Sequence, residues 1–107
     1  MSIFAVQYTY SDDTAARDEH RPAHRTFLGG LAEDGVVLLS GPTTARADEP
    51  DAALLILQGE SEEALLELLR EDPFQQQGLV EQVVVHGWTP VLGSWLDGPL
   101  SDLRSGA

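Results

Sequence analysis

The chain has 107 residues, and its 18 Asp and Glu residues against six arginines and no lysine give a formal net charge of −12. This length predicts one domain. Because an acidic surface repels other anions, we do not expect nucleic acids or anionic membrane surfaces as partners. Without cysteine, the chain has no disulfide, thiolate nucleophile or thiolate metal site. No apolar run approaches the roughly 20 residues of a membrane helix, and no secretion signal is recognised, so we expect a cytoplasmic protein.

The first elements follow from periodicity. Residues Ile3 to Tyr10 alternate between two faces, which predicts a strand. Helix-compatible residues then run from Ala15 to Asp34, behind several candidate N-caps. Pro22 within this run predicts a kinked or two-piece helix, with Pro22 as the first residue of the second piece. Gly35 is expected to end the helix in the left-handed conformation.

The rest of the chain completes a recognisable order of elements. The sequence predicts a strand over Val36–Ser40 that stops before Gly41-Pro42, an exposed connection over 43–51, a strand over Ala52–Leu57, a helix opened by Ser61 and stopped by Pro73, and a last strand over Leu79–Val91. The resulting βαββαβ order predicts an α+β, ferredoxin-like fold with an antiparallel four-stranded sheet.

The strand composition also predicts an assembly. In the last three strands, apolar residues occupy both the odd-numbered and the even-numbered positions. Both faces of the sheet should therefore be buried. Two helices cover only one face, which makes a second copy the simplest cover for the other. We therefore expect a homodimer, or a higher oligomer, of a domain spanning residues 1–95. Residues 96–107 form a tail that docks on a partner or is disordered.

His24 is the most informative titratable residue. It shares the apolar face of the first helix with Phe27, Leu28 and Leu31, where a solvated polar residue is not expected. One interpretation is a core histidine whose ring nitrogens are satisfied by hydrogen bonds. The other is a general base, which requires a carboxylate to fix its tautomer.

Asp72 is the best candidate for that carboxylate. It follows the second predicted helix, where the helix dipole disfavours an anion. The segment Asp72-Pro73-Phe74 also has the pattern of an N-cap followed by proline, which would start a short helical turn ending at Gly78. The capping role and the catalytic role are compatible, and spacing does not separate them.

Metal and cofactor sites are not expected. His20 and His24 lie four positions apart on a helix, but no third ligand is evident. The chain has neither a phosphate-binding loop nor a serine nucleophile motif. His86 alternates with Val84 and is expected at the rim of the sheet or at the dimer surface.

Four segments together resemble the YciI-like (YCII-related domain) family, from about Ile3 to Trp95. They are RPAH at 21–24, GVVLLSGP at 35–42, DPFQQQGL at 72–79 and VVVHGW at 83–88. The resemblance implies a dimeric α+β barrel of ferredoxin-like subunits and an active site built on a His–Asp pair, here His24 and Asp72. The chain departs from the family pattern at Ala52-Ala53, where a glycine often stands, and in its longer tail.

Two functions fit these residues. The first is a small enzyme of lyase or isomerase type that needs no cofactor and acts on a small cyclic or enolisable molecule by proton transfer. In it, His24 moves the proton and Asp72 orients the ring, while the substrate pocket is lined by Arg21, Tyr8, Ser40 and Phe74. The alternative is a non-catalytic dimeric module that binds a ligand or assists another enzyme. A wet pocket reached by both side chains favours the enzyme.

Overall fold

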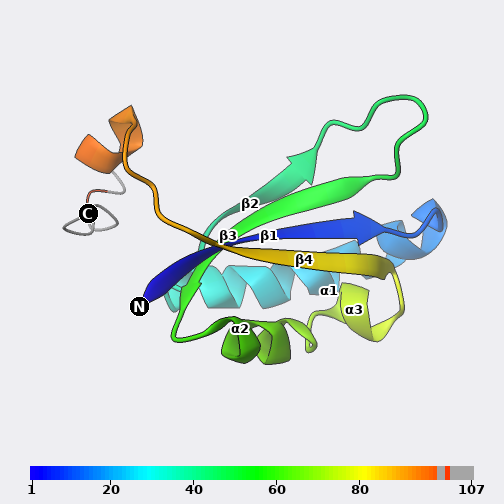
Figure 1. Cartoon of the computed structure of the whole chain (residues 1–107). Coiled ribbons are helices and arrows are strands. Elements are labelled where there is room, and N and C mark those ends of the chain that lie inside the picture. Colours follow the sequence, from blue (N-terminus) through cyan, green and yellow to red (C-terminus); the bar gives the residue numbers. More distant parts are fainter. Residues whose placement is uncertain (99–100, 102–107) are drawn as a thin grey trace.

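The computed structural model describes residues 1–98 and 101, and within them one antiparallel sheet packs against helices (Figure 1). The elements are β1 (Ser2–Tyr10), α1 (Thr14–Glu33), β2 (Val37–Thr43), β3 (Ala52–Gly59), α2 (Glu62–Leu69), α3 (Pro73–Gln76), β4 (Val80–Trp88) and a short 3₁₀ helix, η1 (Ser94–Asp97). The strand order β2-β3-β1-β4 confirms the α+β ferredoxin-like fold.

The core lies between the sheet and the helices. Figure 1 shows α1, α2 and α3 on the same face of the sheet. The central strand β1 alternates as predicted, and its buried side chains on this face are Phe4, Val6, Tyr8 and Tyr10. Leu65 and Leu69 of α2 and Leu28 of α1 join the same cluster. This arrangement places Tyr8 under the helices, where α1 and α3 meet the sheet.

α1 is a single continuous helix with Pro22 inside it, so the two-piece form of the predicted kinked or two-piece helix is wrong, and Pro22 does not start a second helix. Buried residues lie on both sides of the proline, Arg17 before it and His24 and Leu28 after it. An interior proline costs a helix roughly 3 kcal/mol, and the packing of the residues before and after Pro22 offsets this cost. Gly35 then ends the helix segment with φ +79°, which confirms the expected left-handed position.

β2 continues through Gly41 and Pro42 instead of stopping before them. The strand lies at the edge of the sheet and pairs only with β3, where Pro42 is opposite Ala53. An edge strand tolerates proline because one side of its backbone needs no hydrogen-bonded neighbour. The predicted end of β2 was wrong because the local sequence does not show whether a strand lies at the edge of its sheet.

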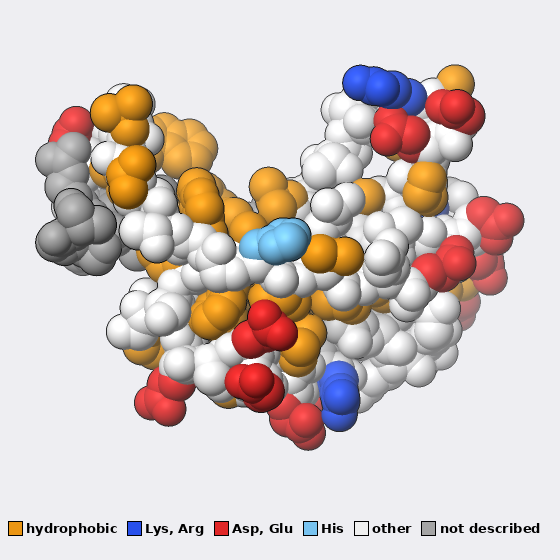
Figure 2. All heavy atoms as spheres, in the orientation of Figure 1, with side chains coloured by type: hydrophobic (Ala, Val, Ile, Leu, Met, Phe, Trp, Pro, Cys, Tyr) orange, Lys and Arg blue, Asp and Glu red, His pale blue; other side chains and the backbone are white. Residues whose placement is uncertain are grey.

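The face of the sheet opposite the helices is open and partly apolar. Leu39, Leu54 and Trp88 remain 41%, 44% and 47% exposed on this chain. Figure 2 shows hydrophobic side chains in a hollow between the raised C-terminal segment and the β2–β3 loop. We call this surface the open face. It matches the two-faced apolar composition that the sequence predicted for the sheet.

The C-terminal segment is described only in part. The predicted tail begins at residue 96, within η1, and Leu96 is buried against its own chain. Leu96 also lines an apolar hollow of about 300 Å³ together with Leu39, Ile56 and Trp88. Residues 99–100 and 102–107 of the tail lie outside the described residues. Within the described part, no helix has the length and apolar character that crossing a membrane requires.

Candidate active site

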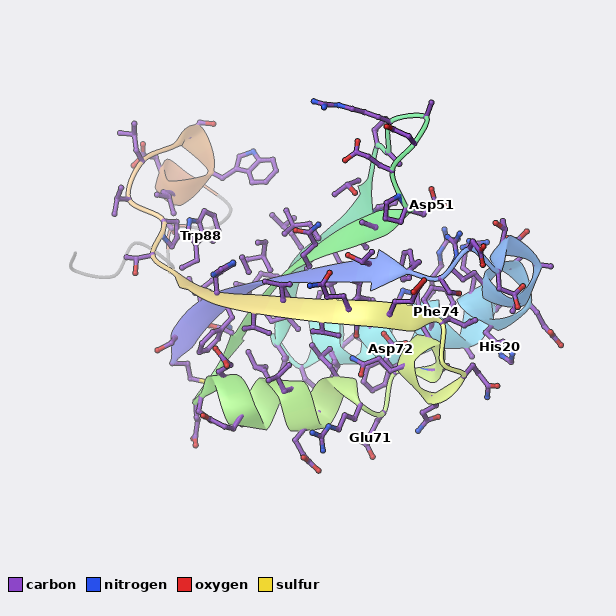
Figure 3. The ribbon with its side chains drawn as sticks, turned by 45° about the vertical axis from the view of Figure 1, so that its right-hand side comes forward. His20, Asp51, Glu71, Asp72, Phe74 and Trp88 are labelled. Atoms are coloured by element: carbon purple, nitrogen blue, oxygen red, sulfur yellow. The ribbon has the colours of Figure 1, made fainter. Side chains whose placement is uncertain are left out.

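Asp72 is fully buried at the junction between α2 and α3. α2 ends at Leu69, earlier than expected, and Asp72 is the N-cap of α3. Its Oδ1 accepts a hydrogen bond of 2.9 Å from the backbone N–H of Phe74, and Pro73 occupies the first turn, which confirms the capping pattern. Its neighbour Glu71 is exposed and points away from the sheet (Figure 3). The cap thus turns one of two adjacent acids into the core.

His24 of α1 reaches the same carboxylate. Its Nδ1 lies 2.8 Å from Oδ1 and 3.0 Å from Oδ2 of Asp72. Because the carboxylate oxygens accept hydrogen bonds, Nδ1 carries the proton and donates it. The neutral ring then keeps Nε2 as an acceptor. Nε2 has no hydrogen-bond partner among the described residues, and it is not among the fully buried side-chain atoms that lack one. It is therefore available for proton transfer.

Tyr8 completes the hydrogen bonding of Asp72 from the sheet side. Its hydroxyl donates to Oδ2 of Asp72 over 3.0 Å and accepts a hydrogen bond of 3.1 Å from Nε2 of Gln75. Burial and the negative charge of Asp72 raise the pKa of Tyr8 well above its usual range. Tyr8 is therefore a neutral donor to the carboxylate. With His24 and the Phe74 amide, it gives the buried charge three donors.

Aromatic contacts fix the plane of the imidazole. The rings of His24 and Phe74 are stacked, with centroids 3.9 Å apart and an interplanar angle of 6°. The ring of Tyr10 meets Phe74 edge-on at 5.5 Å. Burial, followed by the charge of Asp72, raises the pKa of Tyr10 to about 12. The histidine is thus held by a hydrogen bond at one edge and by a ring on its face.

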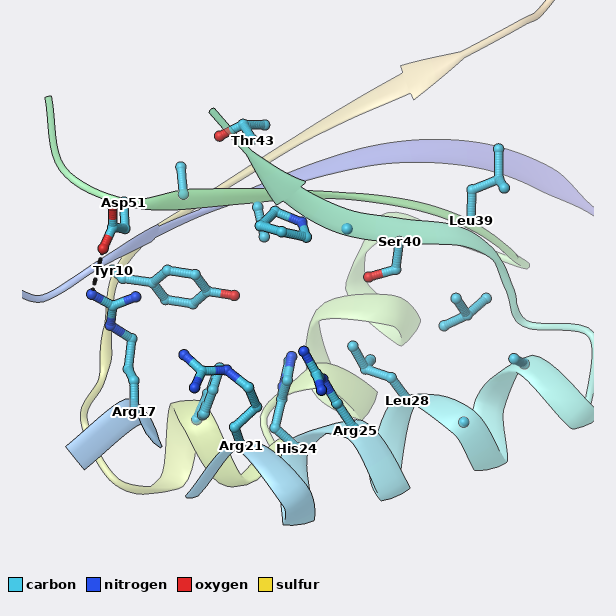
Figure 4. Close-up of a pocket in the computed structure, with 18 of the residues that line it drawn as sticks. Tyr10, Arg17, Arg21, His24, Arg25, Leu28, Leu39, Ser40, Thr43 and Asp51 are labelled. Carbon is cyan, nitrogen blue, oxygen red and sulfur yellow. Dashed lines mark hydrogen bonds and ion pairs between the residues drawn. The ribbon is translucent and has the colours of Figure 1, made fainter. Parts of the chain in front are cut away.

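A cavity of about 630 Å³ lies between α1 and β2, and His24 is in its wall (Figure 4). This volume is within the range of small-molecule pockets. Of the six residues predicted for the site, four line the cavity: Arg21, His24, Ser40 and Phe74. Asp72 and Tyr8 are not in its wall; both are fully buried behind His24. Their position suits the support of the imidazole better than contact with a ligand.

Arg17, Arg25 and Tyr10 are among the wall residues that were not predicted as site residues. Arg17 is buried, and its Nη2 pairs with Oδ2 of Asp51 at 2.7 Å, while its guanidinium lies 5.0 Å from the centroid of the Tyr10 ring. The signal was present in the sequence, because Arg17, Arg21 and Arg25 recur every four residues and so share one helix face.

Metal ligands do not gather in the described part of the chain, where no three His, Asp or Glu side chains are placed to hold an ion. His20 lies elsewhere on α1 and is not in the wall of the cavity (Figure 3). The polar groups around the cavity are those of arginine, histidine, serine, threonine and tyrosine, with Asp51 as the acidic residue. These groups suit the binding of an oxygen-rich organic molecule and the transfer of a proton.

Comparisons with known proteins agree with this architecture. A model of the YCII-related domain matches residues 1–89. A solved structure of 5-chloro-2-hydroxyhydroquinone dehydrochlorinase from Burkholderia phenoliruptrix, in complex with 2,5-dihydroxybenzoquinone, is similar with a TM-score of 0.66 and 22% identity, over 80% of this chain and 92% of that chain.

Two more distant structures share the fold. SnoaB, a cofactor-independent oxygenase from Streptomyces nogalater, has a TM-score of 0.51 and 12% identity over 86% of this chain and 94% of its own. An antibiotic biosynthesis monooxygenase has a TM-score of 0.52 and 15% identity over 86% and 100%. No curated protein sequence matches the chain. At these identities the structural likeness shows the fold alone.

Proposed function

The chain belongs to the YCII-related domain family, and we propose that it is a small enzyme of lyase or isomerase type that moves a proton without a cofactor. Its substrate is a small cyclic or enolisable molecule bound in the cavity between α1 and β2. The observation that carries the proposal is the orientation of His24. Its Nδ1 faces the buried carboxylate, its Nε2 has no hydrogen-bond partner among the described residues, and the residue lines the cavity.

In this mechanism, Nε2 of His24 takes a proton from an acidic O–H or C–H bond, and the electron pair of that bond stays on the substrate as an enolate. Asp72 stabilises the imidazolium by its charge and keeps Nδ1 protonated. The proton then returns to another atom of the substrate, which is an isomerisation, or a leaving anion departs, which is an elimination. After an elimination, the imidazolium of His24 releases its proton to water, so that atoms, charge and electrons balance in both cases without an external oxidant or reductant.

The surroundings of the pair support this role. A neutral Tyr8 and the Phe74 amide donate to Asp72, so the carboxylate is held in place while the histidine changes charge. Ser40 and Arg21 line the cavity on opposite elements, β2 and α1, and can bind the oxygen atoms of a substrate. The dehydrochlorinase that shares the fold acts on a chlorinated hydroxyquinol, which suggests the first compound to test.

The decisive assay is chloride release from 5-chloro-2-hydroxyhydroquinone, together with exchange of substrate protons for deuterium on a panel of hydroxyquinones. Wild-type protein is expected to catalyse one of these reactions. His24→Gln should lower the rate by about 100- to 10,000-fold, the usual effect of losing a general base. The exposed neighbour variant Glu71→Gln should retain it. If the wild type gives neither reaction, or His24→Gln keeps the wild-type rate, the proposal is wrong.

The proposal includes a homodimer formed through the open face. The helices cover the other face, and the apolar side chains of Leu39, Leu54 and Trp88 are left without cover on this chain. A second copy would bury them sheet to sheet, with the hollow seen in Figure 2 as the contact. The cavity lies on the helix side of the sheet, so each subunit would carry a complete His–Asp pair. The cytoplasmic location expected from the sequence stays a prediction.

A further inference from the structure

The cavity is much more basic than the molecule that surrounds it. The chain carries a net charge of −12, with six arginines in total. Three of these arginines line the cavity, whereas Asp51 is the one acidic residue in its described wall. Counting those four residues, the wall has a charge of 3 − 1 = +2 with neutral histidine. An acidic protein that gathers half of its cations at one small cavity provides a local field that attracts anions.

The three arginines are placed together by helix geometry. Arg17, Arg21 and Arg25 are four residues apart on α1, so they are spaced by about 6 Å along one face. In Figure 4 their side chains rise from α1 towards β2, on the same side as His24. The cavity therefore has a row of guanidinium groups that runs past the imidazole.

The arginines differ in how far their charge is already compensated. Arg17 pairs with Asp51, and Arg21 pairs with the exposed Asp18. The Arg25 side chain has no hydrogen bond or ion pair with any described residue. Even the buried Arg17 has one nitrogen, Nε, without a described acceptor. Arg25 is thus the free cation in the described wall of the cavity, directly after His24 in the chain.

We propose that the cavity selects substrates that carry a carboxylate, and that Arg25, assisted by Arg21, binds this group while the reacting part of the molecule faces His24. This inference rests on the proposed function, because it places the reacting atom at Nε2. Arginine suits the task because its planar guanidinium can form two parallel hydrogen bonds to one carboxylate. The cavity of about 630 Å³ accommodates a substituted six-membered ring next to both groups.

Calorimetric titration of the full chain with a matched pair of compounds tests the proposal. The probes are 2,5-dihydroxybenzoate and its neutral amide, 2,5-dihydroxybenzamide. The acid is expected to bind about 10- to 100-fold more tightly than the amide, the range for hydrogen bonds to a charged group. Added salt should reduce this ratio, because screening weakens an exposed ion pair.

Two arginine variants complete the test. Arg25→Gln should lower the acid-to-amide ratio at least about fivefold, since the free charge is lost. Arg70→Gln, at the end of α2 and outside the cavity, should keep the ratio. Equal affinity for the acid and the amide, or an unchanged ratio in Arg25→Gln, would overturn the proposal. If the protein binds the acid selectively but fails the chloride-release and exchange assays, the proposed proton transfer is refuted, while the carboxylate preference of the cavity stands.

Discussion

Nδ1 of His24 lies 2.8 Å from Oδ1 of Asp72, although 48 positions separate the two residues in the chain. The carboxylate is fully buried, and its other contacts come from Tyr8 and the Phe74 amide. The pair is therefore part of the buried core, and its histidine also lines the cavity. Substitutions at these residues should change stability and chemistry together, which makes separate measurements of each necessary.

Asp72→Asn should lower the free energy of unfolding by about 1–3 kcal/mol, because an amide cannot accept from His24, Tyr8 and Phe74 at once and leaves a buried donor unsatisfied. Urea denaturation measures the change. Glu71→Gln is the control, since this adjacent acid is exposed and should shift stability by less than about 0.5 kcal/mol. Similar effects of the two substitutions would contradict the described role of Asp72.

Alkaline pH should destabilise the protein through its buried tyrosines. The pKa of Tyr10 is raised from 10.0 to about 12, and the pKa of Tyr8 is raised further. A raised pKa means that the folded state holds the proton more tightly than the unfolded state. The resulting stabilisation is complete below pH 10 and is lost as pH rises through 12. Unfolding free energies measured from pH 9 upward should fall over this interval.

Tyr10→Phe identifies the source of that loss. No hydrogen bond is described for the Tyr10 hydroxyl, so the variant should retain its stability near neutral pH. Its stability should also fall less steeply above pH 10, because one of the two shifted groups is gone. Spectroscopic titration of tyrosinate provides a second readout. A phenol that titrates near pH 10 in the folded wild type would rule out the burial described for these tyrosines.

Asp51→Asn tests the ion pair that ties the start of β3 to α1. Arg17 is buried, and the substitution removes the charge opposite its guanidinium. We expect a loss of about 1–3 kcal/mol in urea denaturation, typical of a hydrogen bond to a charged group. The exposed pair between Glu67 and Arg70 provides the comparison, and Glu67→Gln should cost between about 0 and 1 kcal/mol. The same loss for both would show that Arg17 is not held by Asp51.

Leu54→Glu should dissociate the proposed homodimer. Leu54 is on the open face of the central part of the sheet, opposite Gln7 in the β1–β3 register. A carboxylate there would be buried without a partner in a sheet-to-sheet contact. Sedimentation analysis of the variant should report a monomer, and Ala64→Glu, on the exposed side of α2, should remain a dimer. A monomeric wild type would refute the assembly directly.

Local sequence patterns singled out His24 and Asp72 but did not show that the two side chains are in contact. The apolar positions around His24 revealed that it faces the core, and the residues after Asp72 revealed an N-cap. Whether a capping carboxylate also reaches a histidine on another helix depends on how the helices pack, which local periodicity does not encode. The sequence offered Asp72 as the best candidate for the partner of His24, the family resemblance implied the same pair, and the structure places the two within hydrogen-bond distance.

The parts that were missed depend on tertiary neighbours. Alternation placed Tyr8 on the buried face of β1, but its hydrogen bond to Asp72 involves a residue 64 positions away. Pro42 appeared to end a strand because the sequence does not show which strand is at an edge. The arginine row on α1 had a readable spacing, yet only the cavity distinguishes it from a solvated helix face.

The edge position of β2 has a consequence for which molecules the cavity can admit. β2 forms one wall of the cavity and is hydrogen-bonded to β3 alone. Displacing such a strand outward breaks one ladder of hydrogen bonds, whereas displacing a central strand breaks two. Substitutions at Ser40 or Pro42 can therefore reshape the cavity while the core strands stay in place. The shape of the cavity can therefore change at β2 with fewer broken ladder hydrogen bonds than a change at a central strand would require.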